Sequence, residues 1–385
     1  MLQLLAEWLK NAGLDFPGLR LMDYVSFKAA LAATISIVIA FLSGKKIIGW
    51  LQKKQIGETI RDLGLEGQMQ KKGTPTMGGV IIILSVVVST LLICDLTNMY
   101  VILLLITTLW CGGIGFLDDS IKVFKHNKEG LSERKKLILQ FALGLGIALM
   151  MCFSEFIHTE NLITTIPFVK AHEFDYSSLS PFNGQLGVYC SWGIYMVMII
   201  IVILACSNGA NLTDGMDGLS TGVSLVVGIV IGVMAWLSGD VLDSKYLNIM
   251  YIPGTDEVAV FMAAFVGALL GFLWYNTFPA QVFMGDTGSL TIGGVIGVSA
   301  VLIRKELLLP LLCGIFLMES LSVLIQRYYF KYTRKKYGEG RRVFLMAPLH
   351  HHYQKKGIPE PRIVTRFWII GILLGVGTLA LMKIR

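Results

Sequence analysis

Three aspartates in two short stretches are the residues best suited to chemistry. Asp118 and Asp119 are adjacent and follow a Gly-rich apolar run, and Asp286 lies in a compact Gly-Asp-Thr-Gly turn. Adjacent carboxylates repel, so one tends to keep its proton unless a cation is near. Oxygen ligation by carboxylates and substrate phosphates is typical of Mg²⁺. The pattern favours a magnesium site with a general base or a phosphate-positioning group. The alternatives are a solvated helix end neutralised by Lys122 and an Asp286 that merely caps a helix.

The stretch Asn208–Gly218 holds two carboxylates, two amides and a hydroxyl between two long apolar runs. Carboxylates at the mouth of membrane helices are costly near lipid, so they usually mark a cation, a substrate or both. Asn211, Asp214 and Asp217 are its candidate binding residues, and the sequence does not rank the two aspartates.

Three further motifs are weaker when taken singly. His350, His351 and His352 are consecutive, and a helix turns ~100° per residue, so the three cannot all face one metal ion. They could hold a phosphate or move a proton, or they could form an exposed basic loop. The stretch Lys71–Gly79 offers a lysine and threonine hydroxyls beside a glycine turn, which suits a diphosphate but is not a P-loop. Asn276 supplies an amide upstream of Asp286.

The composition indicates whether these motifs belong to a soluble or a membrane protein. Of 385 residues, 54% are hydrophobic and 15% are charged, against roughly 25% charged in a typical soluble domain. The mean hydropathy is +0.67. Many apolar runs reach the ~20 residues that cross a bilayer as a helix. We therefore predict an all-α polytopic membrane protein, with residues 1–385 forming a single integral membrane domain.

Ten membrane spans are predicted, and no internal repeat interrupts them. Their expected ranges are Tyr24–Leu42, Gly78–Leu96, Met99–Leu117, Leu137–Ile157, Tyr189–Cys206, Leu219–Leu237, Val258–Leu273, Leu290–Ile303, Leu307–Ile325 and Ile363–Met382.

Lysine and arginine gather in the loops after the first, third and ninth spans, which places those loops in the cytoplasm and both termini outside. This placement accounts for the net charge of +7 without a nucleic-acid partner. The polar motifs also follow odd-numbered spans, so five loops are expected to form one cytoplasmic active-site cleft. The long outer loop 158–188 has no comparable polar cluster.

Taken together, the motifs resemble the phospho-N-acetylmuramoyl-pentapeptide transferases, within the polyprenyl-phosphate N-acetylhexosamine-1-phosphate transferase superfamily. The matching stretches are GTPTMGG (73–79), GFLDD (115–119), NLTDGMDGL (211–219), YNTFPAQVFMGDTGSL (275–290) and MAPLHHH (346–352). With ten spans in the same order, the resemblance covers nearly the whole chain. One departure is local, because residues 65–68 lack the histidine often found before Lys71.

The resemblance implies transfer of phospho-MurNAc-pentapeptide from UDP-MurNAc-pentapeptide to undecaprenyl phosphate, giving lipid I and UMP in peptidoglycan biosynthesis. It implies a Mg²⁺-dependent homodimer in the bacterial inner (plasma) membrane. The catalytic residues carried over from the family are Asp118, Asp119, Asp286, His350, His351 and His352, with the three aspartates as metal ligands. The substrate-binding residues carried over are Lys71, Thr76, Lys122, Asn211, Asp214, Asp217, Asn276 and Phe283.

Two mechanisms and two other functions remain open on the sequence. The lipid phosphate could attack the sugar-linked phosphorus directly, with Asp118 keeping the attacking oxygen deprotonated, or Asp118 could carry the phosphoryl group covalently. A relative that transfers N-acetylglucosamine-1-phosphate to the same lipid is the closest alternative, and the MAPLHHH stretch argues against it. A nucleotide-sugar transporter is more distant, since its site would lie at midplane, often within a repeat.

Overall fold

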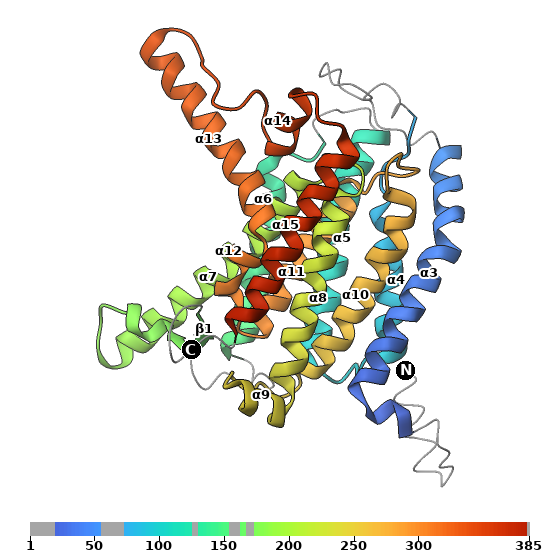
Figure 1. Cartoon of the computed structure of the whole chain (residues 1–385). Coiled ribbons are helices and arrows are strands. Elements are labelled where there is room, and N and C mark those ends of the chain that lie inside the picture. The colour runs from blue at the N-terminus through green and yellow to red at the C-terminus, as the bar shows by residue number, and fades with distance from the viewer. Residues whose placement is uncertain (1–19, 55–72, 125–129, 154–161, 167–172, 383–385) are drawn as a thin grey trace.

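The computed structural model describes residues 20–54, 73–124, 130–153, 162–166 and 173–382, and it is built almost entirely of helices (Figure 1). Within the described residues each of the ten predicted spans contains a helix, so the prediction of an all-α polytopic membrane protein is confirmed. The helices at the spans are α3 (Val25–Lys53), α4 (Gly79–Ile93), α5 (Met99–Phe124), α6 (Glu133–Phe153), α7 (Gly184–Thr213), α8 (Leu219–Gly239), α10 (Thr255–Asn276), α11 (Gly285–Leu302), α12 (Leu309–Leu312) with α13 (Gly314–Tyr337), and α15 (Glu360–Leu381).

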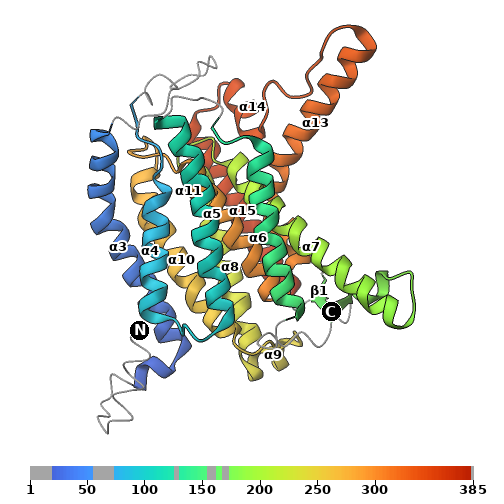
Figure 2. The same ribbon diagram turned by 180° about the vertical axis from the view of Figure 1, so that it is seen from behind.

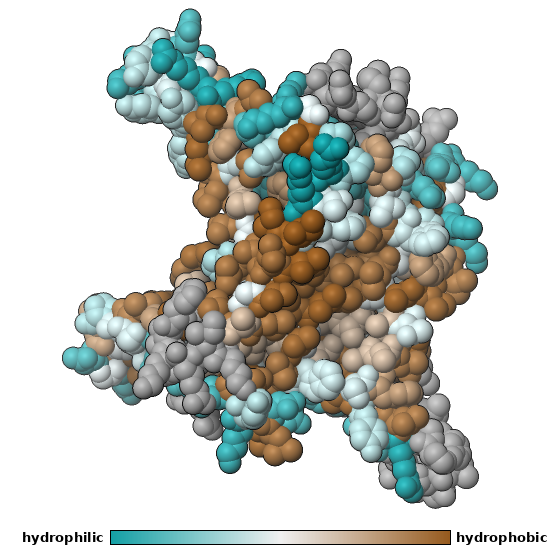
Figure 3. All heavy atoms as spheres, viewed as in Figure 1, coloured by the Kyte–Doolittle hydropathy of each residue, from teal (hydrophilic) through white to brown (hydrophobic). Residues whose placement is uncertain are grey.

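The spans differ from one another in ways that hydropathy alone did not predict. Within the described residues, eight helices are long and apolar enough to cross a membrane, and α4, with 15 residues, is shorter than expected. The ninth span is broken, since Glu306–Leu312 and Gly314–Tyr337 meet at 76°. Beyond this bend α13 leaves the bundle as a projecting arm (Figure 1). An apolar band crosses the middle of the molecule between polar ends (Figure 3), as a bilayer requires.

Helix α11 lies at the centre of the bundle. Every residue from Thr287 to Leu302 is buried, and α11 packs against α4, α5, α7 and α8. Seen from behind, α4 and α5 cover it (Figure 2). Small residues permit this packing, because without a side chain two backbones can approach closely. A Cβ added at Gly293 would lie 2.3 Å from the carbonyl oxygen of Cys206.

Glycines also allow α5 and α4 to pack closely against the first turn of α11. A Cβ at Gly115 would lie 2.2 Å from the carbonyl oxygen of Asp286, and one at Gly79 would lie 2.1 Å from the backbone nitrogen of Gly288. Helix α11 begins at Gly285, five residues before the predicted start of its span. Asp286 therefore lies in the first helical turn rather than in a preceding loop.

A small sheet closes the opposite end of the bundle. Strands β1 (Ile163–Thr165) and β2 (Glu173–Asp175) pair antiparallel, and the 3₁₀ turn η3 (Tyr176–Leu179) follows them. The Lys305 Nζ atom donates to Thr165 Oγ1 at 2.8 Å, and the Tyr176 hydroxyl donates to Glu306 Oε1 at 3.0 Å. The described part of loop 158–188, which the sequence predicts to lie outside and to hold no polar cluster, is thus joined by buried polar groups to the break between α11 and α12.

Replacing Gly115 by alanine should separate α5 from α11. The added methyl group meets backbone atoms that cannot rotate away, and overpacking of this kind costs about 1–3 kcal/mol. Gly115→Ala is expected to lower the apparent melting temperature of the purified protein. Gly113→Ala is the matched control, because Gly113 lies on the same helix and a Cβ there meets nothing within 4 Å. Equal melting temperatures for the two variants would contradict the close approach.

Candidate active site

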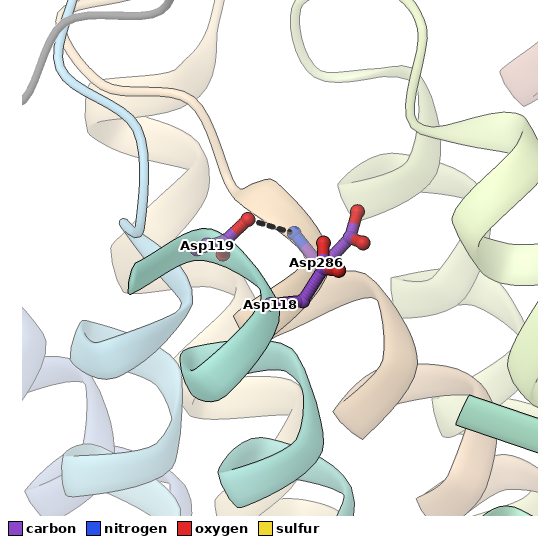
Figure 4. Close-up of side chains that lie close together, drawn as sticks. All are labelled: Asp118, Asp119 and Asp286. Atoms are coloured by element: carbon purple, nitrogen blue, oxygen red, sulfur yellow. Dashed lines mark hydrogen bonds between the residues drawn. The ribbon is translucent and has the colours of Figure 1, made fainter. Parts of the chain in front are cut away.

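Three aspartates from two helices converge where α5 ends and α11 begins (Figure 4). One oxygen of each of Asp118, Asp119 and Asp286 lies within 4.8 Å of the others. Asp118 and Asp119 are buried, and the side chain of Asp286 is 16% exposed. The two stretches that the sequence singles out are 167 residues apart, and the contact between α5 and α11 brings them together.

Asp119 holds the start of α11. Its Oδ1 accepts from the backbone nitrogen of Asp286 at 3.2 Å, the contact drawn in Figure 4. Its Oδ2 accepts from the backbone nitrogen and the hydroxyl of Thr287, at 2.9 and 2.6 Å. The first backbone N–H groups of a helix have no partner within the helix, and a carboxylate there also interacts favourably with the helix dipole. Both oxygens of Asp119 are therefore used in positioning Asp286.

Asp118 and Asp286 share two lysines. The Nζ atom of Lys122 lies 2.6 Å from Asp118 Oδ2 and 3.1 Å from Asp286 Oδ2, which confirms the predicted pairing of Lys122 with one of the two adjacent aspartates. The Nζ atom of Lys136 lies 3.0 Å from Asp118 Oδ1 and 2.6 Å from Asp286 Oδ2. The backbone nitrogen of Leu131 donates to Asp118 Oδ1 at 2.6 Å.

Lys136 is a residue that sequence reasoning missed. It lies in the first turn of α6, within a basic stretch from which the sequence predicts only the orientation in the membrane. Its neighbours Arg134 and Lys135 are exposed, whereas the side chain of Lys136 is 20% exposed. The one signal in the sequence was the position of Lys136 on the side of α6 that faces the bundle.

The donor set of this cluster fits a hard divalent cation. Carboxylate oxygens suit Mg²⁺, Mn²⁺ and Ca²⁺, whereas zinc prefers cysteine and histidine. Asn211 adjoins the cluster, since its Nδ2 donates to Asp286 Oδ1 and to Ser289 Oγ, each at 2.9 Å. Three carboxylates against two lysines leave a formal charge of −1, so a cation would find an attractive field there.

Asp217 and Asn276 are buried in a scaffold beside the cluster. Asp217 Oδ2 accepts from the backbone nitrogen of Ala280 at 3.0 Å. Asn276 Oδ1 accepts from the backbone nitrogen of Gly218 and from the Thr221 hydroxyl, at 3.1 and 2.8 Å. These bonds fasten the Asp214–Gly218 turn to the segment after α10. Asp214 is half-buried, so it is the more accessible of the two aspartates in this turn.

The segment before α4 runs beside the segment before α11. The backbone nitrogen of Phe283 donates to the Pro75 carbonyl at 2.8 Å, and that of Gly78 donates to the Phe283 carbonyl at 2.8 Å. Thr76 is buried close to Gly285, where an added Cβ would lie 2.9 Å from the Thr76 hydroxyl. Two predicted substrate-binding residues, Thr76 and Phe283, are thus brought to the start of α11. Lys71 lies outside the described residues.

The three histidines begin the short helix α14 (Leu349–Lys355) and have separate environments. His350 is fully buried, and its Nδ1 lies 3.1 Å from Glu319 Oε2. His351 is half-buried, with its Nδ1 3.2 Å from Gln354 Oε1. His352 Nδ1 accepts from the backbone nitrogen of Leu345 at 3.1 Å. Burial, together with the charge of Lys356, lowers the pKa of His352, which favours its neutral, accepting form.

Comparison with known proteins places these features in a family. The profile of glycosyl transferase family 4 matches residues 101–304, and the first phospho-N-acetylmuramoyl-pentapeptide-transferase signature matches residues 71–83. A phospho-N-acetylmuramoyl-pentapeptide-transferase of Flavobacterium psychrophilum is 52% identical over 96% of this chain and 97% of its own length. One of Parabacteroides distasonis is 50% identical over 97% of each chain.

Asp286→Asn should weaken binding of a divalent cation. Removing one carboxylate ligand is expected to lower the affinity for Mn²⁺ by at least about tenfold, as changes at metal sites commonly do. Electron paramagnetic resonance of Mn²⁺ titrated into the purified protein measures this without substrate. Asp243→Asn is the control, because Asp243 is exposed on the distant helix α9 (Val241–Leu247). Equal affinity in the two variants would exclude Asp286 as a ligand.

Asp119→Asn should lower stability even in the absence of metal. An amide presents an NH₂ group where Asp119 now accepts from Asp286 and Thr287, and lost bonds to a charged acceptor cost about 1.5–3 kcal/mol each. The expected result is a lower apparent melting temperature in metal-free buffer with chelator. If the variant and the unmodified protein had the same apparent melting temperature, Asp119 would not hold the start of α11.

Proposed function

The chain belongs to the phospho-N-acetylmuramoyl-pentapeptide-transferase family, and from this premise we propose that it transfers phospho-MurNAc-pentapeptide from UDP-MurNAc-pentapeptide to undecaprenyl phosphate, giving lipid I and UMP. One observation carries the proposal beyond the family name. Three carboxylates and two lysines meet at the start of a buried helix, beside the segments that the resemblance assigns to substrate.

The first obstacle to this reaction is charge. A nucleotide diphosphate and a lipid phosphate are both anionic, and at close range they repel strongly unless positive charge lies between them. Lys122 and Lys136 supply two ammonium groups within 3.1 Å of Asp286. In the proposal these lysines exchange carboxylate contacts for phosphate oxygens when substrates enter. Asp118 and Asp286 then become available to a cation.

The cation we propose is Mg²⁺, held by Asp286 and Asp118 with Asn211 beside them. When bound, it supplies positive charge that neutralises the diphosphate and stabilises UMP as a leaving group. Asp119 keeps Asp286 in place through the start of α11. The half-buried Asp214 is proposed to contact the nucleotide-sugar. Asp217 and Asn276 stabilise its turn through their hydrogen bonds.

We propose a single displacement. An oxygen of the lipid phosphate attacks the phosphorus linked to the sugar, the bond to the bridging oxygen breaks, and UMP leaves with that electron pair. The lipid phosphate is already anionic near pH 7, so it needs little help from a base. The environment of Asp118 supports this route over a covalent one, because Asp118 is fully buried and, in this proposal, its oxygens would bind the cation once the lysines have moved to phosphate oxygens.

The arrangement in the membrane is part of the same proposal. The far end of α13, whose last turn is basic, the end of α3 and the start of α6 lie at the same end of the bundle as the end of α5 and the start of α11, which carry the aspartates (Figure 1). Basic residues favour the cytoplasmic side, so the cleft is proposed to open there. Residues 1–385 then act as one transferase domain in the bacterial inner membrane, and we propose that two copies form a homodimer.

The direct test is conversion of radiolabelled UDP-MurNAc-pentapeptide to a butanol-soluble product by purified protein with undecaprenyl phosphate and Mg²⁺. The expected result is stoichiometric release of UMP and no product from UDP-N-acetylglucosamine. Product from UDP-N-acetylglucosamine alone would favour the related sugar-phosphate transferase instead.

Lys136→Met should slow this reaction strongly. Removing one of two positive charges at a site of developing negative charge is expected to lower kcat by on the order of 10²-fold. The adjacent Lys135→Met is the matched control, because Lys135 is exposed and is not among the lysines that contact the cluster. If both variants turn over at similar rates, Lys136 has no part in the transfer.

A further inference from the structure

A second buried titratable pair lies outside the aspartate cluster. Glu319, in the second turn of α13, is 0% exposed, and so is His350 on α14. His350 Nδ1 lies 3.1 Å from Glu319 Oε2, and the backbone nitrogen of His350 donates to the same oxygen at 3.4 Å. The backbone nitrogen thus donates a hydrogen bond to this oxygen, whereas Nδ1 lies within ion-pair distance of it without hydrogen-bond geometry. Helix α13 is the arm that leaves the bundle, so this pair ties its buried end to α14.

The two side chains depend on each other for charge. Among the described residues, His350 is the basic group that pairs with Glu319, and Glu319 Oε1 has no hydrogen-bond partner. A buried carboxylate alone favours its protonated form, and a buried imidazole alone favours its neutral form. At 3.1 Å, each side chain offers the other a polar partner in this buried environment. Because both side chains are buried, they are more stable there together than either would be alone.

The far side of the imidazole faces the predicted nucleotide-sugar turn. His350 Nε2 has no hydrogen-bond partner among the described residues. A Cβ added at Gly215 would lie 2.2 Å from this nitrogen, so the ring occupies the space that any side chain at position 215 would need. Gly215 itself is exposed, and it lies between Asp214 and Asp217. The imidazole therefore lies directly beneath the surface of the turn.

We propose that Glu319 is a positioning residue for the transfer reaction. Its carboxylate fixes the tautomer and the orientation of His350 through Nδ1. The imidazole ring in turn fixes the position of the Asp214–Gly218 turn. This inference rests on the proposed function for the role of that turn in binding the nucleotide-sugar. It assigns the first histidine of the motif a supporting role that differs from those of His351 and His352.

Four variants test the chain of contacts. E319L removes the carboxylate and leaves a neutral imidazole, so no unpaired charge is buried. E319Q keeps the shape and one accepting oxygen. G215A presses on the ring from the opposite side without touching Glu319. G371A is the matched glycine control, because a Cβ there meets nothing within 4 Å. Apparent melting temperature and size-exclusion profile establish folding, and G215A carries the test alone if E319L does not fold.

The kinetic readout separates this role from general loss of structure. In E319L and G215A, the KM for UDP-MurNAc-pentapeptide should rise about tenfold, as displacement of a binding group predicts, while the KM for undecaprenyl phosphate stays within about twofold. E319Q should recover most of the loss. A double variant E319L/G215A should be no worse than either single variant, because both act through one ring. Equal KM values in E319L and the unmodified protein, or equal losses in E319L and E319Q, would overturn the proposal.

A spectroscopic readout needs no substrate. In protein labelled with ¹⁵N-histidine, the His350 signals, assigned by difference from H350Q, should show a protonated Nδ1 in the unmodified protein and in E319Q. In E319L they should shift to a tautomer mixture. An unchanged spectrum in E319L would overturn the proposal. Absence of turnover in the unmodified protein would instead contradict the proposed function, and the spectra would still decide the role of Glu319.

Discussion

Three carboxylates within 4.8 Å of one another cannot remain ionised in an apolar bundle without positive charge beside them. Lys122, Lys136 and the backbone N–H groups at the start of α11 meet this constraint. Much of the surrounding fold serves to bring these groups together. Gly115 and Gly79 lack the side chains that would keep α5 and α4 away from α11. The extensive buried contact between these helices then fixes the positions of the charged groups.

The sequence predicted the apolar helices because bilayer thickness imposes a length that hydropathy reveals; it did not predict that α4 is short or that the ninth span is bent. It also selected Asp118, Asp119 and Asp286, since paired carboxylates near apolar runs are unusual. It did not find Lys136, whose neighbours carry the same charge and whose contact with Asp286 spans 150 residues of chain. Nor did it find a partner for Glu319, because Glu319 and His350 are 31 residues apart on two different helices, α13 and α14. Contacts of this kind depend on helix packing rather than on local pattern.

The structure also divides residues that looked equivalent in sequence. Asp118 faces lysines, whereas its neighbour Asp119 holds a helix start, since adjacent helical residues point in directions ~100° apart. The same geometry separates the three histidines of α14. Asp217 and Asn276 are buried and accept hydrogen bonds from neighbouring backbone and hydroxyl groups, whereas Asp214 is the more accessible carboxylate of its turn. A site of this kind places its charges on few residues and uses the others to hold those residues in position.

The central claim is that this site works by positioning and charge, with no covalent phospho-enzyme at Asp118. The most direct measurement is the stereochemical course at phosphorus, using UDP-MurNAc-pentapeptide made chiral with oxygen isotopes at the sugar-linked phosphate. A single in-line displacement inverts the configuration, and inversion is the result we predict. Retention would require two successive displacements, and it would contradict the proposal that Asp118 binds the cation and does not attack phosphorus.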